Sequence, residues 1–103
     1  MFSGAPIVVL SRFYPAPSRR AELMTLLEGL ATQAVSTEAC FQAQVFHSDQ
    51  DEESIVLIAR WTDEDSLQAF LNSIITGEER EIVELLTRPV MRERFRAMEA
   101  PTG

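Results

Sequence analysis

The stretch SIVLIARWTDEDSLQAFL, residues 54–71, decides the fold of this chain. Residues 55–59 form a continuous apolar run rich in β-branched side chains, which predicts a strand buried on both faces. After Trp61, residues 62–65 have the form of a capping box, in which the Thr62 hydroxyl would accept a hydrogen bond from the amide three residues on. A helical apolar stripe then follows, made of Leu67, Phe70, Leu71 and Ile74. A large indole is therefore expected at the seam between a buried strand and its covering helix, where small apolar pockets form.

The composition predicts one globular domain, with a core over about residues 7–98. The chain has 103 residues, of which 46% are hydrophobic, and this suffices for a single core. Sixteen acidic and nine basic residues give a net charge of −7, which opposes binding to nucleic acid or to an anionic membrane. The sequence has no apolar run of membrane-spanning length.

The N-terminal residues and the cysteine content predict a cytoplasmic protein. No positively charged segment precedes the first apolar run, so we expect no signal peptide. Cys40 is the only cysteine, and an internal disulfide is therefore impossible. We expect it to be a small buried hydrophobic residue rather than a nucleophile.

The first half of the chain predicts a strand, a helix and a second strand. Residues 7–14 begin with four apolar residues and end at Pro15, which predicts the strand. The helix is expected over about residues 19–35, with Ser18 as its N-cap. Gly29 lies inside it, and this unfavourable choice suggests that a neighbouring backbone approaches closely. Residues 39–47 predict a strand that forms a hairpin with residues 55–59 through a polar turn.

The second half predicts a further helix and a last strand. Residues 76–79 have the form of a second capping box, which would begin a short helix carrying Ile82 and Leu85. Residues 90–98 alternate arginines with other side chains, which favours a strand after Pro89. A helix remains the alternative, because Met91, Phe95 and Met98 also have helical spacing.

These elements predict an α+β, ferredoxin-like fold. Its four-stranded antiparallel sheet would carry the helices on one face. The first and third strands are apolar on both faces, yet the helices can cover only one. A second copy of the chain is the simplest cover for the other face, so we expect a homodimer.

The chain resembles the antibiotic-biosynthesis-monooxygenase family of dimeric α+β barrels. The resemblance extends over about residues 7–98 and depends on VVLSRFYPAP, TEACFQAQVFHSDQD and VLIARWTDEDSLQAFLNS, the last of which contains the family's strand-three tryptophan at Trp61. It implies sheet-to-sheet packing across a homodimer and a pocket between each subunit's sheet and its helices. Family members include oxygenases of phenols and quinols that need no cofactor, haem-degrading enzymes and isomerases, so the fold does not settle the reaction.

Departures from the family pattern argue against two of the reactions that the resemblance suggests. The haem-degrading branch carries an Asn at the position of Ser11 and an iron-ligating His near Arg80. Serine cannot replace the amide and arginine has no lone pair for iron, which argues against haem degradation. The polyketide-oxidising branch is expected to carry an amide and a phenol where this chain has Leu57 and Leu67, and this departure argues against an anthrone-type activity.

Trp61, Arg80 and His47 are the candidate catalytic residues, and each has a structural alternative. Trp61 would stack on a planar ligand, or would only join strand to helix in the core. Arg80 would hold a phenolate or carboxylate, or would pair with the surrounding glutamates on a solvated helix. His47, the only histidine, would be a general base, or an exposed residue at a strand end.

The remaining polar residues bear on three questions: a metal site, a cofactor and an anionic substrate. His47, Asp49 and Asp51 lie close in the sequence but in a polar turn, so we expect no metal site. The sequence contains no phosphate-binding or dinucleotide-binding glycine motif, and we expect no cofactor. A basic stripe in an acidic chain would bind an anionic substrate or pair with carboxylates across strands or subunits; it comprises Arg88, Arg92, Arg94 and Arg96.

The sequence therefore predicts a monooxygenase that oxidises a small aromatic phenol or quinol with dioxygen and without a cofactor. Trp61 and Phe70 would form the walls, Arg60 or Arg80 would face the anion, and His47 would be the base. The other side chains expected to contact the substrate are Ser11, Phe13, Leu57 and Leu67. The alternative is a dimer of the same fold that binds an aromatic metabolite without turnover.

Overall fold

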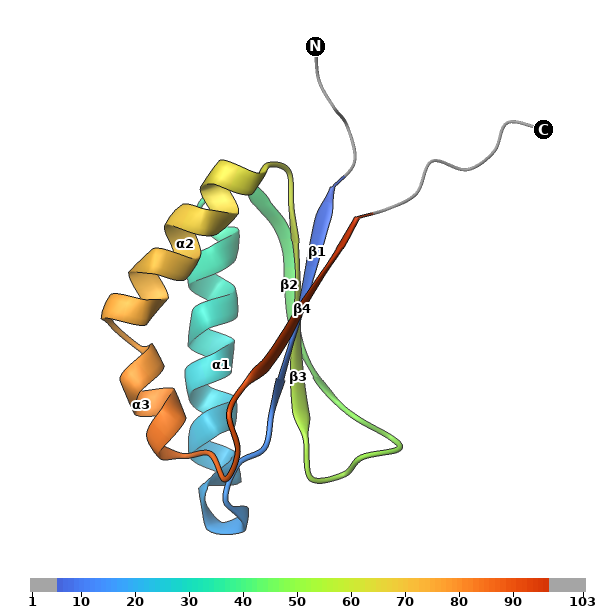
Figure 1. Cartoon of the computed structure of the whole chain (residues 1–103), viewed down its shortest axis with the longest axis vertical. Coiled ribbons are helices and arrows are strands. Elements are labelled where there is room, and N and C mark those ends of the chain that lie inside the picture. Colours follow the sequence, from blue (N-terminus) through green and yellow to red (C-terminus); the bar gives the residue numbers. More distant parts are fainter. Residues whose placement is uncertain (1–5, 97–103) are drawn as a thin grey trace, which may run out of the picture.

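The computed structural model describes residues 6–96, apart from the side chains of residues 75 and 76. Residues 97 and 98 of the expected last strand lie outside the described residues. The order of elements follows the chain in Figure 1: β1 (Ile7–Phe13), a 3₁₀ turn (Pro17–Arg19), α1 (Arg20–Val35), β2 (Cys40–His47), β3 (Ile55–Trp61), α2 (Glu64–Thr76), α3 (Glu79–Glu84) and β4 (Met91–Arg96).

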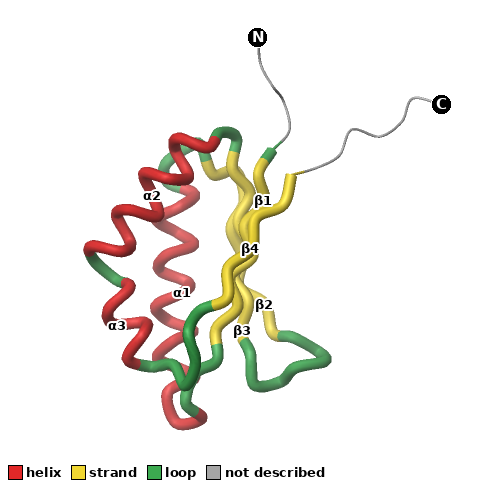
Figure 2. The backbone as a smooth tube through the Cα atoms, in the orientation of Figure 1, coloured by secondary structure: helices red, strands yellow, loops and turns green. Residues whose placement is uncertain are grey.

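The strands form one antiparallel sheet in the order β2-β3-β1-β4. All three helices lie on the same side of it, as both ribbon views show (Figures 1 and 2). The register of the central pair runs from Ile7 opposite Trp61 to Phe13 opposite Ile55. This arrangement confirms the predicted ferredoxin-like α+β fold.

The last segment is a strand, and the helical alternative is wrong. β4 pairs with β1 along its length, so that Ser11 lies opposite Arg92 and Val8 opposite Phe95. Because side chains alternate across a strand, Arg92, Arg94 and Arg96 share the face that carries the helices. Pairing with β1 outweighed the helical spacing of Met91 and Phe95, which instead share the other face.

The face of the sheet without helices carries apolar side chains on all four strands, interspersed with polar ones, namely Arg12, Gln42, Gln44, Arg60 and Glu93. Val8 and Leu10 of β1 lie on it beside Val56 and Ile58 of β3, as the register requires. Three large apolar side chains of the outer strands are solvent-exposed here, namely Phe46 (39%), Phe95 (43%) and Met91 (61%). The uncovered apolar face expected from the sequence is therefore present.

The helix-covered face forms two adjoining hydrophobic clusters. In the first, α1 buries Leu23 and Leu27 completely against Phe13 and Ile55. In the second, Trp61 and Leu67 pack with Ala34 of α1. Phe70 packs against both clusters, so α2 joins the two halves of the core.

Three predicted helix caps are wrong in detail. The N-cap of α2 is Asp63, whose carboxylate accepts from the Ser66 amide at 2.8 Å. Thr62 still belongs to the strand end, because its amide donates to the Ala39 carbonyl. Residue 76 is the last residue of α2 rather than a cap, and the N-cap of α3, Glu78, makes no side-chain capping bond. Ser18 lies in the 3₁₀ turn, and α1 begins after Arg19 without a side-chain cap.

The close approach expected at Gly29 is absent from the described part of the chain. A methyl group added at Gly29 would meet nothing within 4 Å. Gly29 lies on the exposed side of α1, so its unfavourable helix propensity has no packing reason within one subunit. Over residues 6–96, no helix is long and apolar enough to cross a membrane.

Candidate functional site

A small cavity lies between the sheet and its covering helices. Its volume is about 50 Å³, and apart from three polar side chains its lining is apolar or aromatic. Such a volume holds a few water molecules, whereas pockets for drug-sized ligands measure about 300–1,000 Å³. An aromatic ring can therefore enter only if the lining side chains or α2 move outward.

The predicted seam between Trp61 and α2 forms one wall of this cavity. The Trp61 ring lies 5.2 Å from that of Phe70, centroid to centroid, with the planes inclined at 44°. Trp61 is only 1% exposed, so it is a core residue and a cavity wall at once. A place in the core and a place in the cavity wall are thus compatible for Trp61.

Six of the predicted substrate-contacting and catalytic side chains line the cavity together. The strand residues face the helices and the α2 residues face the sheet: Ser11 and Phe13 of β1, Leu57 and Trp61 of β3, and Leu67 and Phe70 of α2. Leu57 and Leu67 make the wall beside Trp61 apolar, as the sequence led us to expect.

Ser11 is the polar exception on the sheet side, and it pairs with Arg92. The two residues lie opposite each other on neighbouring strands, and Arg92 Nε donates to Ser11 Oγ at 3.2 Å. Ser11 is 6% exposed, whereas Arg92 is exposed, because β4 is the edge strand. The pair therefore connects the interior of the cavity to its open edge.

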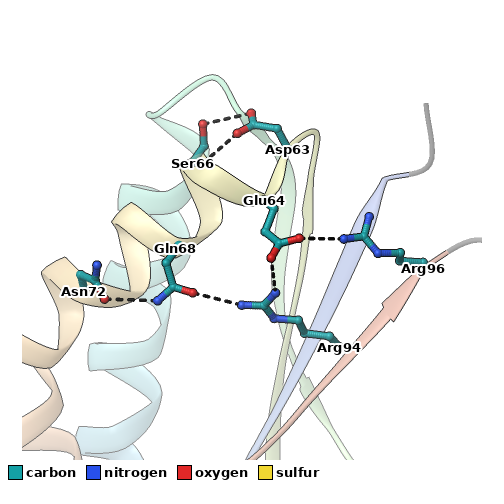
Figure 3. Close-up of polar contacts among 7 residues, drawn as sticks. All are labelled: Asp63, Glu64, Ser66, Gln68, Asn72, Arg94 and Arg96. Carbon is teal, nitrogen blue, oxygen red and sulfur yellow. Dashed lines mark hydrogen bonds and ion pairs between the residues drawn. The ribbon is translucent and has the colours of Figure 1, made fainter. Parts of the chain in front are cut away.

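Beside this pair, a polar cluster ties α2 to β4. Glu64 contacts two arginines, with Oε1 2.8 Å from Arg96 Nη2 and Oε2 3.5 Å from Arg94 Nη1. Arg94 also donates to Gln68, which in turn donates to Asn72 along the helix. Figure 3 shows the two arginines of β4 reaching Glu64 and Gln68 of α2, so these side chains connect the edge strand to the helix.

Glu79, the first residue of α3, is the third polar side chain of the lining. It is partly buried, and its carboxylate makes no hydrogen bond or ion pair with any described residue. A carboxylate in this position is able to accept a proton from a ligand hydroxyl.

The structure does not bring His47, Arg60 or Arg80 to this cavity. His47 lies at the far end of β2, where its Nδ1 is 3.0 Å from Arg20 Nη2. Arg60 lies on the sheet face without helices, since it directly follows a helix-facing position and precedes Trp61. Arg80 is exposed on α3 and is absent from the lining.

The polar turn beside His47 has a structural organisation of its own. Asp51 accepts from the Tyr14 hydroxyl at 2.9 Å, and its amide donates to Ser48. The hydrogen bond from the Tyr14 hydroxyl to Asp51 raises the pKa of Tyr14. The Arg88 guanidinium lies over the Tyr14 ring, 4.1 Å from its centroid. Among residues 6–96, no group of three His, Cys, Asp or Glu side chains is placed to hold a metal ion.

Cys40 is a buried part of the second cluster. Burial raises the pKa of its thiol, which donates to the Gln42 carbonyl at 3.2 Å. A thiol in this state is a poor nucleophile.

Arg92 and Glu79 are the site residues that the sequence did not single out. Arg92 was noted only as part of a basic stripe, and its special position depends on strand register. Ser11 and Arg92 are 81 residues apart in the chain, and periodicity carries no information about which strands pair. Glu79 lies among several other glutamates in the sequence, and no pattern distinguishes it from them.

Comparisons with known proteins agree with the fold described above. A family model described as antibiotic biosynthesis monooxygenase matches residues 6–99. The Mycobacterium tuberculosis protein Rv0793 is 26% identical, with a TM-score of 0.82 over 94% of this chain and 99% of the other. A conserved protein from Methanosarcina mazei is 22% identical, with a TM-score of 0.77 over 91% of this chain and 94% of the other.

A third structure, described as antibiotic biosynthesis monooxygenase, is 16% identical, with a TM-score of 0.79 over 90% of this chain and 99% of the other. At such identity the likeness concerns the fold alone. A search of curated proteins found no match.

Proposed function

The chain belongs to the antibiotic biosynthesis monooxygenase family, and we propose that it oxidises a small aromatic phenol or quinol with dioxygen, without metal or flavin. The observation that carries the proposal is the apolar cavity walled by Trp61 and Phe70, with Ser11, Glu79 and Arg92 as its polar lining residues. An aromatic ring suits such walls, because it gains both buried area and ring-to-ring contact. The small volume favours compact ligands over polycyclic ones.

The chemistry relies on the reactivity of the ligand. A phenol that loses its proton becomes electron-rich enough to reduce dioxygen, and a carbon–oxygen bond then forms at a ring carbon that carries hydrogen. The oxygen–oxygen bond of this peroxy adduct breaks; one oxygen remains as a quinone carbonyl and the other leaves as water. The protein contributes a water-poor cavity, while Glu79 replaces the remote His47 as the proposed proton acceptor.

Oxygen uptake tests this proposal directly. Purified protein, treated to remove metals, is mixed with one-ring and two-ring phenols and quinols, and each rate is compared with spontaneous autoxidation. We expect saturable uptake of one dioxygen per quinone formed, with no oxygen returned when catalase is added. Uptake at the autoxidation rate throughout the panel would refute turnover of this substrate class.

A matched pair of variants locates the reaction. Phe70→Leu removes an aromatic wall and should reduce the saturable rate, whereas Phe41→Leu makes the same change at an exposed side chain outside the lining. Equal rates in the two variants would argue that the reaction does not take place in this cavity.

Binding without turnover is the second candidate function. Leu57 and Leu67 favour it, because they leave the wall beside Trp61 without the amide and phenol that the resemblance led us to expect in polyketide-oxidising relatives. Calorimetric binding of a quinol under nitrogen, together with no excess oxygen uptake in air, would select this function.

We also propose a homodimer in which the uncovered sheet faces pack together. Exposed Phe46, Phe95 and Met91 support it, as does the resemblance to dimeric barrels. Phe95→Glu should convert a dimer to a monomer in sedimentation analysis. Val83→Glu places the same charge on an exposed site of α3 and should leave the dimer intact. A monomeric wild-type protein would exclude this assembly.

A further inference from the structure

Arg92 differs from its two neighbours on the helix-facing side of β4. Arg94 and Arg96 both pair with Glu64, as Figure 3 shows, whereas Arg92 forms no ion pair with any residue from 6 to 96. Only its Nε is engaged, through the hydrogen bond to Ser11, and its two terminal nitrogens have no hydrogen-bond partner in that range. Arg92, which lines an apolar cavity, thus keeps the four N–H donors of its two terminal nitrogens unused among the described residues.

The Ser11 hydroxyl is a further unused donor at the same wall of the cavity. Its oxygen accepts from Arg92, so the hydroxyl hydrogen remains available to a ligand in the cavity. The lining around Ser11 is apolar and Ser11 itself is buried, so a hydrogen bond from its hydroxyl to an anion would be strengthened there, whereas exposed Arg92 would act from the edge of the cavity. The hydrogen bond from Nε to Ser11 holds the guanidinium of Arg92 against β1, and it leaves the terminal nitrogens for another acceptor.

We propose that Arg92 and Ser11 form an anion-binding subsite that recognises the ionised oxygen of a small phenol, with the ring directed toward Trp61 and Phe70. The ligand class rests on the proposed function, but binding requires no turnover. The subsite selects compact phenols that ionise readily over their ethers, which present no charged oxygen.

Two probes of nearly equal shape test the subsite on the full chain. 4-Nitrophenol ionises near neutral pH and its phenolate is coloured, while 4-nitroanisole cannot ionise. We expect 4-nitrophenol to bind about ten- to a hundred-fold more tightly by calorimetry, the effect of one or two charge-assisted hydrogen bonds. The phenolate band of the bound probe should persist to a lower pH than that of the free probe.

The chain offers a matched control for the arginine. Arg92→Gln should lose the preference for 4-nitrophenol and the shift of the phenolate band, yet bind 4-nitroanisole as the wild type does. Arg94→Gln removes the same charge two residues away, where the side chain contacts Glu64 and Gln68, and should change neither probe. Ser11→Ala should produce a smaller loss of the same preference. Circular dichroism confirms that each variant is folded.

Three outcomes would overturn the subsite: wild-type protein that binds neither probe, equal binding of both probes, or equal losses in Arg92→Gln and Arg94→Gln. The last would indicate general attraction to a basic edge instead. Failure of the proposed function is distinguishable, because phenolate binding that depends on Arg92 without oxygen uptake supports the subsite and refutes the oxidation. Oxygen uptake that Arg92→Gln leaves unchanged supports the oxidation and refutes the subsite.

Discussion

The indole of Trp61, the last residue of β3, packs against the ring of Phe70 on α2 with 5.2 Å between centroids. Nine residues of chain thus leave the sheet, turn and return to cover the same side chain. The contact fixes the distance between α2 and the sheet, and with it the width of the cavity. Entry of the proposed ligand would therefore have to disturb a contact of the core.

We expect Trp61→Ala to destabilise the protein severely. Truncation of a buried tryptophan costs about 3–5 kcal/mol, a large fraction of the roughly 5–15 kcal/mol that stabilises a small domain. Urea unfolding followed by circular dichroism measures the loss, since the variant lacks the chain's only tryptophan. Val83→Ala, at an exposed site, is the control, and a comparable loss in both would contradict the assigned core position.

Gly29→Ala should stabilise the chain by about 0.5–1 kcal/mol, because alanine gains helix propensity and the added methyl group meets no atom within 4 Å. Thermal and urea unfolding measure the gain. Gly77→Ala is the matched control: Gly77 caps α2 rather than lying inside it, so no such gain is expected. A loss at Gly29 would indicate that another surface packs against α1 in the assembled protein.

Glu38 has a φ of 69°, which is a left-handed backbone conformation. This conformation is unfavourable for every residue except glycine and, to a lesser degree, asparagine. Glu38→Gly should therefore raise the free energy of unfolding by about 1 kcal/mol. Ser36→Gly is the control, since Ser36 has a φ of −68° and gains nothing from glycine. A decrease for Glu38→Gly would show that its side chain stabilises the turn in another way.

The hydrogen bond to Asp51 raises the pKa of Tyr14 above its ordinary value of 10.0. The folded state then holds the phenol proton more tightly than the unfolded state. The stabilisation is complete below pH 10.0 and is lost as the pH rises through the folded pKa. Ultraviolet titration reports Tyr14 alone, because the chain has one tyrosine. Asp51→Asn should lower this pKa, and an unchanged titration would disprove the contact.

Hydrogen bonds from the Ser66 amide and hydroxyl lower the pKa of Asp63 below its ordinary value of 3.8. Its stabilisation is therefore present above pH 3.8 and is lost as the pH falls through the folded pKa. Asp63→Asn should retain the cap near neutral pH and reduce the loss of stability in acid, whereas Asp63→Ala should lose the cap at every pH. Urea unfolding at several pH values measures both. Equal acid sensitivity in wild type and Asp63→Asn would refute this assignment.

Local patterns in the sequence predicted the elements well, because each pattern reports which side chains share a face of a helix or strand. The apolar run before Trp61, the leucine stripe of α1 and the arginine alternation of β4 each produced the expected element. The helix caps were less predictable, since Thr62 and Asp63 both suit an N-cap and the hydrogen bond from Thr62 to Ala39 decides between them. Such a bond joins distant segments, so local propensity cannot reveal it.

The sequence by itself determined the fold class and which side chains of one strand share a face, because alternation along a strand is a local property. The resemblance to the family, rather than alternation, singled out Ser11, Leu57 and Trp61, and the pairing of β1 with β3 places them on one face. Only the tertiary structure decided which polar groups meet there. Strand order and register place Arg92 opposite Ser11, leave Arg60 on the other face and keep His47 at the far end of β2. The physical reason is that pairing between strands is a long-range choice, made by the packing of the whole core.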